Sequence, residues 1–286
     1  MPPSRRQVNV FRKSSQPLLR VSNSSEARVD LLGPKHVRTT LFVTLLASCV
    51  IAGCAARQTW VLAPGQHAQT FQRTITVEAR GRLLLFLPAG FDRSGATRYP
   101  LLIFLHGSGE SGEDLEKLKV HGPPRIVASR PDFPFILASP QARNYIERFD
   151  PVVLDAMLDE LLEQLPIDPD RVYLTGLSMG GMWTYGWASL RPDRFAAIAP
   201  VCGDWDAADA CRLKHIPVWA FHGAKDDVVP IAGDQAMIEA IRACGGDARL
   251  TVYPDTGHDS WTAAYADPEL FPWLLQQRRK PAAGQK

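Results

Sequence analysis

An apolar segment that runs directly into a glycine-flanked serine constrains the fold of this 286-residue chain more than any other feature. Residues 171–175 (Arg-Val-Tyr-Leu-Thr) have the composition of a buried strand, and Gly-Leu-Ser-Met-Gly-Gly follows at 176–181. Where a strand reverses into a helix within one residue, the flanking positions have no room for a side chain. Glycine, which has none, fits there. The pattern therefore predicts a strained strand-to-helix turn that projects the hydroxyl of Ser178 above a sheet.

The order of segments around this turn predicts the fold class. From Phe71 onward, short apolar segments alternate with amphipathic ones, which is typical of a mostly parallel sheet covered by helices on both faces. We expect an α/β fold of about eight strands, at 72–78, 82–87, 100–105, 134–138, 171–175, 195–201, 217–221 and 248–253. Helices are expected at about 151–165, 179–190 and 231–243, with a last one after His258. Because residues 203–215 leave little room for an insertion, we expect no cap domain.

The N-terminal region predicts export. Residues 41–53 (LFVTLLASCVIAG) are uncharged and apolar, too short to span a bilayer comfortably, and of the length of a signal-peptide core. They end in Ile-Ala-Gly-Cys at 51–54, which resembles the lipobox of bacterial lipoproteins, where the cysteine is acylated and becomes the mature N-terminus. A buried core helix, or a signal without lipidation cut near Ala55, is the alternative.

These signals divide the chain into four segments. We expect a disordered extension, or one upstream of the true start codon, at 1–37, a signal peptide at 38–53, a tether at 54–69 and a single folded domain at 70–280. The expected location is the cell envelope, facing the periplasm or the exterior, with the membrane reached only through a lipid on Cys54.

Charge argues against a nucleic-acid partner. The chain has a net charge of +2, and residues 1–40 hold eight Lys/Arg against two Asp/Glu, or +6, which leaves about −4 for the remainder. A domain without basic excess has little to neutralise phosphates with. The sequence makes no prediction of an oligomeric state.

Three cysteines, Cys202, Cys211 and Cys244, fall within the expected domain. An oxidising compartment permits one disulfide, and we expect it between Cys202 and Cys211. No cysteine stands with a histidine at metal-ligand spacing, so no metal and no cofactor is predicted.

A serine hydroxyl is a poor nucleophile without an adjacent base. His258 follows the last expected strand, on a loop that opens the final helix, and completes the chain order serine, aspartate, histidine that this fold requires. The other histidines of the domain have different predicted roles. His106 and His222 end strands within His-Gly turns and are expected to shape those loops, while His121 and His215 are expected to face solvent.

The carboxylate that orients the histidine should lie on the loop at 222–230, where Asp226 and Asp227 are adjacent and equally suitable on physical grounds. The helix N-terminus after the serine offers the Met179 N–H to a developing oxyanion. A second donor is expected from the loop at 106–110, either the Ser108 N–H or, as the alternative, that of Gly109. A phosphate-binding loop is excluded because the sequence has neither a Gly-Lys-Ser/Thr motif nor a Gly-x-Gly-x-x-Gly motif that opens a helix.

At these segments the sequence resembles the carboxylesterase/phospholipase-type α/β-hydrolases, in the branch called predicted peptidases, which includes feruloyl-esterase-like enzymes. The resemblance covers roughly residues 70–278 and rests on four quoted segments: Phe-Leu-His-Gly-Ser-Gly-Glu at 104–110, Asp-Pro-Asp-Arg-Val-Tyr at 168–173, Arg-Pro-Asp-Arg-Phe at 191–195 and Gly-His-Asp-Ser-Trp at 257–261. In that family the pattern His-Gly-x-x-Asp-x-x-Val-Pro carries the acid, which implies Asp226. Trp183 stands where the family often has a small residue.

Together these features predict a serine hydrolase that cleaves small or polymer-borne carboxylic esters through an acyl-enzyme on Ser178. The alternatives are a serine peptidase acting on small peptides and, from another class, a non-catalytic binding protein on the same fold. Candidate pocket residues are Gly109, Trp183 and Trp261, with Trp187 and Trp205 as further aromatic candidates; core packing is the alternative role for the tryptophans.

Overall fold

The computed structural model describes residues 76, 78–144 and 149–279, which belong to the compact unit Arg73–Lys286. The predicted signal peptide, Cys54 and the tether lie outside the described residues, and so does most of the strand predicted at 72–78. Within the described ranges, no helix is both long and apolar enough to cross a membrane.

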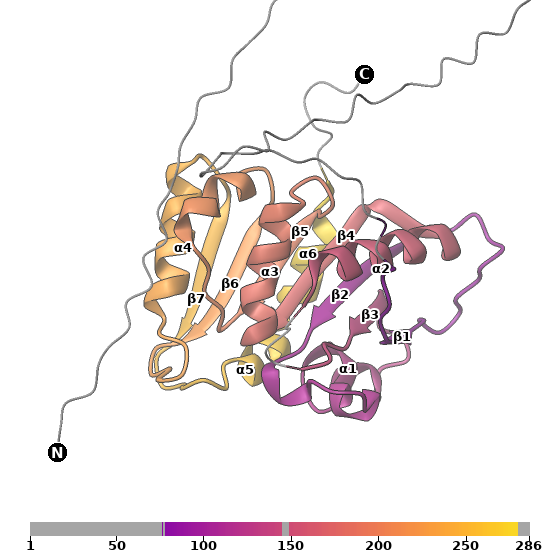
Figure 1. The fold of residues 1–286 in the computed structure, drawn as a ribbon, viewed down its shortest axis with the longest axis horizontal. Coiled ribbons are helices and arrows are strands. Elements are labelled where there is room, and N and C mark those ends of the chain that lie inside the picture. Colours follow the sequence, from indigo (N-terminus) through magenta and orange to yellow (C-terminus); the bar gives the residue numbers. More distant parts are fainter. Residues whose placement is uncertain (1–75, 77, 145–148, 280–286) are drawn as a thin grey trace, which may run out of the picture. The chain divides into compact units, whose positions relative to one another are not determined.

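A single sheet organises the described residues (Figure 1). Its seven strands are β1 (Leu83–Phe86), β2 (Tyr99–Leu105), β3 (Ile136–Pro140), β4 (Ile167–Leu177), β5 (Ala197–Val201), β6 (Val218–Gly223) and β7 (Ala248–Tyr253). Their order is β1-β3-β2-β4-β5-β6-β7. Only β1 runs antiparallel to its neighbour, and every other described pairing is parallel. The predicted α/β class and its mostly parallel sheet are confirmed.

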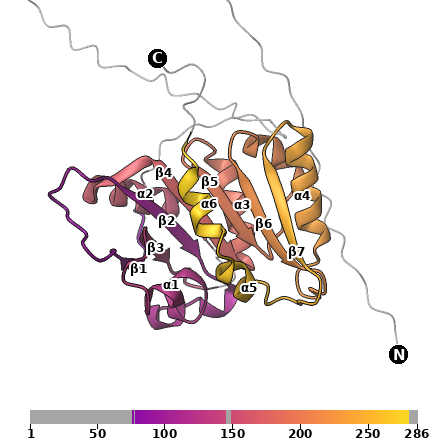
Figure 2. The same cartoon turned by 180° about the vertical axis from the view of Figure 1, so that it is seen from behind.

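Helices cover both faces of the sheet. They are α1 (Gly122–Val127), α2 (Pro151–Gln164), α3 (Met179–Leu190), α4 (Ala232–Ala243), α5 (Trp261–Ala266) and α6 (Leu270–Gln276), with 3₁₀ turns at Ser108–Glu110, Leu115–Lys119 and Ala207–Leu213. One face carries α2, α3 and α4, and the other carries α1, α5 and α6, as the two opposite views show (Figures 1 and 2). The final predicted helix is divided into α5 and α6.

Local sequence explains where α2 begins. The side chain of Asp150 accepts a hydrogen bond from the Val152 N–H at 2.8 Å, and Pro151 occupies the first helical position, where a missing N–H costs nothing. Leu154, Leu158 and Leu161 recur at helical spacing and are buried against the sheet. The amphipathic pattern therefore fixes both the start and the buried face of this helix.

The alternation of side chains along β2 divides the core into two layers. Leu101, Ile103 and Leu105 belong to the layer under α2, α3 and α4, whereas Leu102 and Phe104 belong to the opposite layer. Such a strand, buried on both faces, is expected to read as a continuous apolar run.

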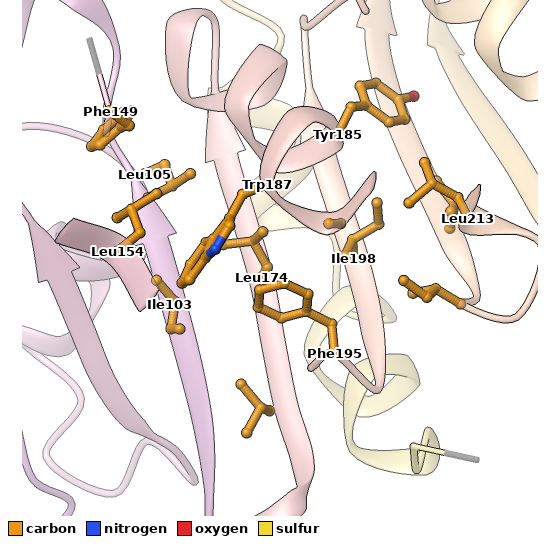
Figure 3. Packing of buried hydrophobic residues seen from close by; sticks show 14 of the residues in the cluster. Ile103, Leu105, Phe149, Leu154, Leu174, Tyr185, Trp187, Phe195, Ile198 and Leu213 are labelled. Carbon is orange, nitrogen blue, oxygen red and sulfur yellow. The ribbon is translucent and has the colours of Figure 1, made fainter. Parts of the chain in front are cut away.

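The first of these layers also contains Trp187, which is fully buried and packs edge-on against Phe195, with ring centroids 4.9 Å apart (Figure 3). The suggestion that Trp187 lines a pocket is therefore wrong: its ring points into the core, and its indole N–H donates to Asp155.

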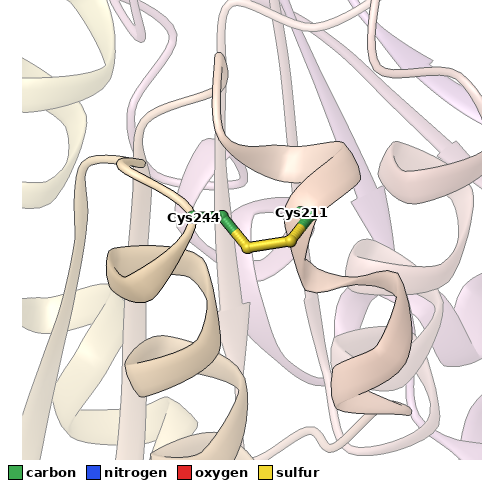
Figure 4. The surroundings of a disulfide bond; sticks show 2 residues. All are labelled: Cys211 and Cys244. Atoms are coloured by element: carbon green, nitrogen blue, oxygen red, sulfur yellow. A yellow bond between two sulfur atoms is a disulfide. The ribbon is translucent and has the colours of Figure 1, made fainter.

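The predicted disulfide is also wrong. Cys211 is bonded to Cys244, with Cα atoms 5.3 Å apart (Figure 4). Cys202 is a buried free thiol. Cys202 follows β5 with its side chain in the core. The C-terminal end of α4 packs on the Ala207–Leu213 turn and brings Cys244 to Cys211. The pair is set by tertiary packing and not by closeness in sequence.

Candidate active site

Ser178 occupies the reversal between β4 and α3 in a backbone conformation that L-residues rarely adopt, with φ of 52° and ψ of −118°. Positions 176 and 180, on either side of this serine, have room only for glycine. A Cβ at Gly180 would collide with the carbonyl oxygen of Leu105, and one at Gly176 would collide with that of Gly180. The turn is therefore held by backbone-to-backbone contact between β2, β4 and α3, and the serine is fixed at the carboxyl edge of the sheet.

Two loops bring a histidine and an aspartate to this serine. His258, between β7 and α5, places Nε2 3.0 Å from Ser178 Oγ. Its Nδ1 lies 2.8 Å from Asp226 Oδ2, on the loop that follows β6. The serine hydroxyl, the imidazole and the carboxylate thus form one continuous hydrogen-bonded chain.

The carboxylate at the end of this chain is tightly held. Its other oxygen, Asp226 Oδ1, accepts the N–H groups of Val228 at 3.0 Å and Val229 at 2.9 Å. Burial alone would raise the pKa of Asp226, but the hydrogen bonds from His258 and from these two amides outweigh it and lower that pKa below its ordinary value. Asp227 is exposed and forms none of these contacts. Of the two aspartates, only Asp226 is brought to His258.

The two amides predicted to bind an oxyanion begin helical turns at the same edge. Met179 is the first residue of α3, where the N–H has no carbonyl within the helix to bond. Ser108 opens the 3₁₀ turn after β2 and is exposed, as is Gly109. The end of β2 rests on the serine turn, since a Cβ at Gly180 would also lie 2.8 Å from the carbonyl oxygen of His106. The backbone that leads into the Ser108 turn therefore packs against the serine turn.

Comparison with known proteins agrees with this architecture. Residues 140–268 match the model of the dienelactone hydrolase family. The "Putative esterase NocK" of Nocardia uniformis subsp. tsuyamanensis is 30% identical over 59% of this chain and 52% of its own length. The "Probable feruloyl esterase C" of Aspergillus terreus is 29% identical over 54% of this chain and 58% of its own. The chain thus spans little more than half of these curated relatives.

A solved structure is similar over a longer stretch. The crystal structure of a thermostable esterase has 30% identity and a TM-score of 0.59, over 69% of this chain and 59% of that one. The described residues have the fold of the α/β-hydrolases.

In this fold, His106 has a structural position. It is fully buried, its Nδ1–H donates to the Gly107 carbonyl at 2.6 Å, and its Nε2 accepts the Ala142 N–H at 2.9 Å. Burial lowers its pKa to about 4, only partly opposed by the bond to Gly107, so the ring is neutral near pH 7. As predicted from its His-Gly turn, the ring shapes the loop.

Aromatic rings flank His258. The ring of Trp261 stands edge-on to that of His258, with centroids 5.3 Å apart and planes at 89°. The ring of His121 in turn lies 5.4 Å from that of Trp261. His121 Nε2 is also 3.7 Å from Glu110 Oε1. Burial raises the pKa of Glu110, although the charge of His121 opposes this. The prediction that His121 faces solvent is wrong, because the loop before α1 folds its half-buried ring against Trp261.

The remaining pocket candidates lie in different surroundings. Trp183 is half-buried, packs against Trp205 with centroids 5.7 Å apart, and lines a groove of about 1140 Å³ beside α2 together with Phe149 and Ala142. Gly109 is exposed, with open space around its Cα. The three predicted pocket residues therefore do not line one common pocket. Trp261 contacts His258, whereas Trp183 lines the groove beside α2.

One group of described residues has metal-ligand proximity. Cys202, Asp226 and His258 offer ligand atoms within 4.8 Å of one another. Burial raises the pKa of the Cys202 thiol to about 12, which opposes thiolate ligation, and Asp226 is already bonded to His258. We assign no metal to this cluster.

A buried polar pair behind Asp226 was missed from the sequence. Asp234 on α4 and His222 at the end of β6 are both fully buried and lie 2.6 Å apart. A signal for it exists, because residues 234, 237, 238 and 241 share the buried face of α4 and Asp234 is the charged member. A carboxylate on an apolar helix face requires a buried partner.

Proposed function

We propose that this α/β-hydrolase is a serine carboxylester hydrolase that acts through an acyl-enzyme on Ser178. The observation that carries the proposal is the hydrogen-bonded chain from Ser178 Oγ through His258 to Asp226. It begins at a serine that has a strained backbone conformation at the edge of the sheet. A buried structural serine would not need both a base and an oriented carboxylate.

Acylation follows from the direction of these hydrogen bonds. Ser178 Oγ attacks the ester carbonyl carbon while its proton passes to His258 Nε2, 3.0 Å away. Asp226 keeps the proton of His258 on Nδ1 and stabilises the imidazolium that forms. The carbonyl oxygen becomes an oxyanion, for which we assign the amides of Met179 and Ser108 as donors.

Collapse of this tetrahedral intermediate breaks the bond to the alkoxide, which leaves with the proton from His258. A water molecule then loses a proton to His258 Nε2, attacks the acyl carbon and releases the carboxylic acid, and Ser178 recovers its proton. The same two donors hold the second oxyanion.

For the substrate we propose carboxylic esters whose acyl group passes beside Trp261, the ring in edge contact with His258. The name of the Aspergillus relative makes feruloyl esters a specific member of this class to test. A panel of p-nitrophenyl esters of increasing chain length, with methyl ferulate, measures the preference directly.

The decisive experiment is labelling by a fluorophosphonate probe with parallel ester hydrolysis. We expect the wild type to be labelled and active and Ser178→Ala to lose both, with kcat lower by about 10⁴ to 10⁶. Ser129→Ala, which removes an exposed serine hydroxyl, is the matched control and should behave as wild type. Wild-type turnover by Ser178→Ala would refute the proposal.

We also propose that the enzyme is exported and held at the cell envelope by a lipid on Cys54. The support is the apolar run at 41–53 and the lipobox-like residues 51–54. More than one acyl chain on such a cysteine is enough for stable attachment, where a single chain would be marginal.

A further inference from the structure

A second histidine–aspartate pair stands behind Asp226. The carboxylate oxygen that bonds His258, Asp226 Oδ2, also lies 3.2 Å from Nε2 of His222. The Nδ1 of His222 lies 2.6 Å from Asp234 Oδ2, and the other oxygen of Asp234 accepts the hydroxyl of Tyr185 at 2.5 Å. His222, Asp234 and Tyr185 are all buried, so this network reaches the proposed active site without contact with solvent.

The partners of His222 determine where its protons are. Nε2 must carry hydrogen, because it also lies 2.8 Å from the carbonyl oxygen of Val229, which can only accept. The contact between Nδ1 and Asp234 Oδ2 requires one proton between the two atoms. The pair is therefore either imidazolium with carboxylate or neutral imidazole with carboxylic acid.

The surrounding groups favour the charged arrangement. An imidazolium at His222 lies between two carboxylates, Asp234 and Asp226, and the Tyr185 hydroxyl supports the ionised form of Asp234. Burial alone would lower the pKa of His222, but the hydrogen bond and the charge of Asp234 outweigh it and raise that pKa.

Other titratable groups near the pair stay protonated or lie further from it. Burial raises the pKa of Tyr185 well above its ordinary value and that of Cys202 to about 12, so neither carries charge near neutral pH. Burial, together with the charge of Asp204, raises the pKa of Asp234, and the hydrogen bonds from His222 and Tyr185 oppose this. We assign the charged arrangement on the geometry, because two carboxylates face the ring of His222. The charge on His222 is therefore decided by Asp234 and Asp226.

We propose that His222 is a positioning residue of the hydrolase: held as a buried imidazolium by Asp234, and donating from Nε2 to the Val229 carbonyl, it keeps a positive charge 3.2 Å from Asp226 Oδ2 and so partly neutralises the carboxylate that orients His258. The inference rests on the proposed function. His222 touches no reacting atom, and it acts through Asp226 alone.

Asp226 therefore has three hydrogen-bond donors and a neighbouring positive charge. Oδ1 accepts two backbone amides and Oδ2 accepts from His258, while the charged ring of His222 places Nε2 3.2 Å from Oδ2. The positive charge of His222 faces Asp226. Because it partly neutralises that carboxylate, Asp226 stabilises a doubly protonated His258 less strongly. The pair therefore holds the general base unprotonated to lower pH than Asp226 alone would allow.

Asp234→Asn tests the charge while keeping the shape. The amide can donate to His222 Nδ1 and accept from Tyr185, so the hydrogen bonds persist, but His222 becomes neutral. We expect the acid limb of the pH profile of kcat/KM to move upward by about half a pH unit. Asp227→Asn removes the same charge from an exposed neighbour of Asp226 and should leave the limb in place.

His222→Gln, which places a neutral amide where the ring stands, should show the same upward movement as Asp234→Asn, because both variants remove the positive charge beside Asp226. An unchanged limb in Asp234→Asn would mean that the pair is neutral in the wild type. A downward movement would mean that Asp226 alone keeps His222 charged. Either result overturns the proposal.

A spectroscopic measurement reads His222 without any turnover. In ¹⁵N-histidine-labelled protein near neutral pH, we expect the two ring nitrogens of His222 to resonate together as an imidazolium in the wild type. In Asp234→Asn they should split as a neutral Nε2–H tautomer. The signals are assigned by their loss in His222→Gln. A neutral pattern in the wild type refutes the inference even if hydrolysis is as proposed, whereas full activity of Ser178→Ala refutes the function and leaves this result standing.

Discussion

Acid should destabilise the folded protein through His106 in a way that a single variant can isolate. The ring donates from Nδ1 to Gly107 and accepts at Nε2 from the Ala142 N–H, and none of it is exposed. Protonation would place a second N–H against the Ala142 amide and a charge in the core. Burial accordingly lowers the pKa of His106 from 6.5 to about 4.

The sign and size of the effect follow from linkage. Above pH 6.5 the ring is neutral in both the folded and the unfolded chain, and the full stability is present. Between that value and about pH 4 the unfolded chain binds a proton that the folded protein does not, so the free energy of unfolding falls. The difference between the two pKa values is worth about 3 kcal/mol in all, at 1.36 kcal/mol per pH unit.

His106→Gln removes the titration while its amide oxygen can still accept from Ala142. Urea unfolding at about pH 7 and about pH 4.5 should show that the variant loses about 2 kcal/mol less than the wild type over this interval, although it is less stable at pH 7. His215→Gln, at an exposed histidine, is the matched control and should keep the wild-type pH dependence. Equal pH dependence in His106→Gln and the wild type would show that His106 is not a buried neutral ring.

Three further perturbations test other parts of the structure. Asp226→Asn should lower kcat on p-nitrophenyl acetate by about 10⁴ because the tautomer of His258 is lost, whereas Asp227→Asn should stay within about twofold of wild type; similar losses in both would move the assignment. The disulfide closes a separation of 33 residues, so replacing Cys211 and Cys244 by serine should lower the free energy of unfolding by about 3 kcal/mol in urea titrations, and an unchanged midpoint would contradict a stabilising cross-link. Cys54→Ala should abolish incorporation of labelled fatty acid and shift the protein out of the detergent phase; a wild-type chain that fractionates as unlipidated would disprove the anchor.

The parts of the fold that were predictable are those encoded by neighbouring residues. The glycines at 176 and 180 mark the serine turn because the steric demand at that point is local. The leucines of α2 and its Asp-Pro start likewise lie within a few residues of one another. The chain order that placed Asp226 before His258 is a property of topology, and the residues themselves left Asp226 and Asp227 open.

What could not be predicted depends on packing between distant elements. Cys244 reaches Cys211 only because α4 packs on the turn at Ala207–Leu213. His121 meets Trp261 because the loop before α1 folds toward α5, and nothing near His121 in the sequence encodes that. The position of Asp234 on the buried face of α4 indicates a buried partner, but only the structure identifies it as His222.

The backbone at Ser178 has a consequence for the balance between activity and durability. At a φ of 52° and a ψ of −118° any side chain is strained, by an amount on the order of 1 to 3 kcal/mol, and glycine is not. Replacing the nucleophile by glycine would therefore relax the turn and give an inert protein that unfolds at higher temperature than the active one. Selection for stability alone would favour glycine at this position.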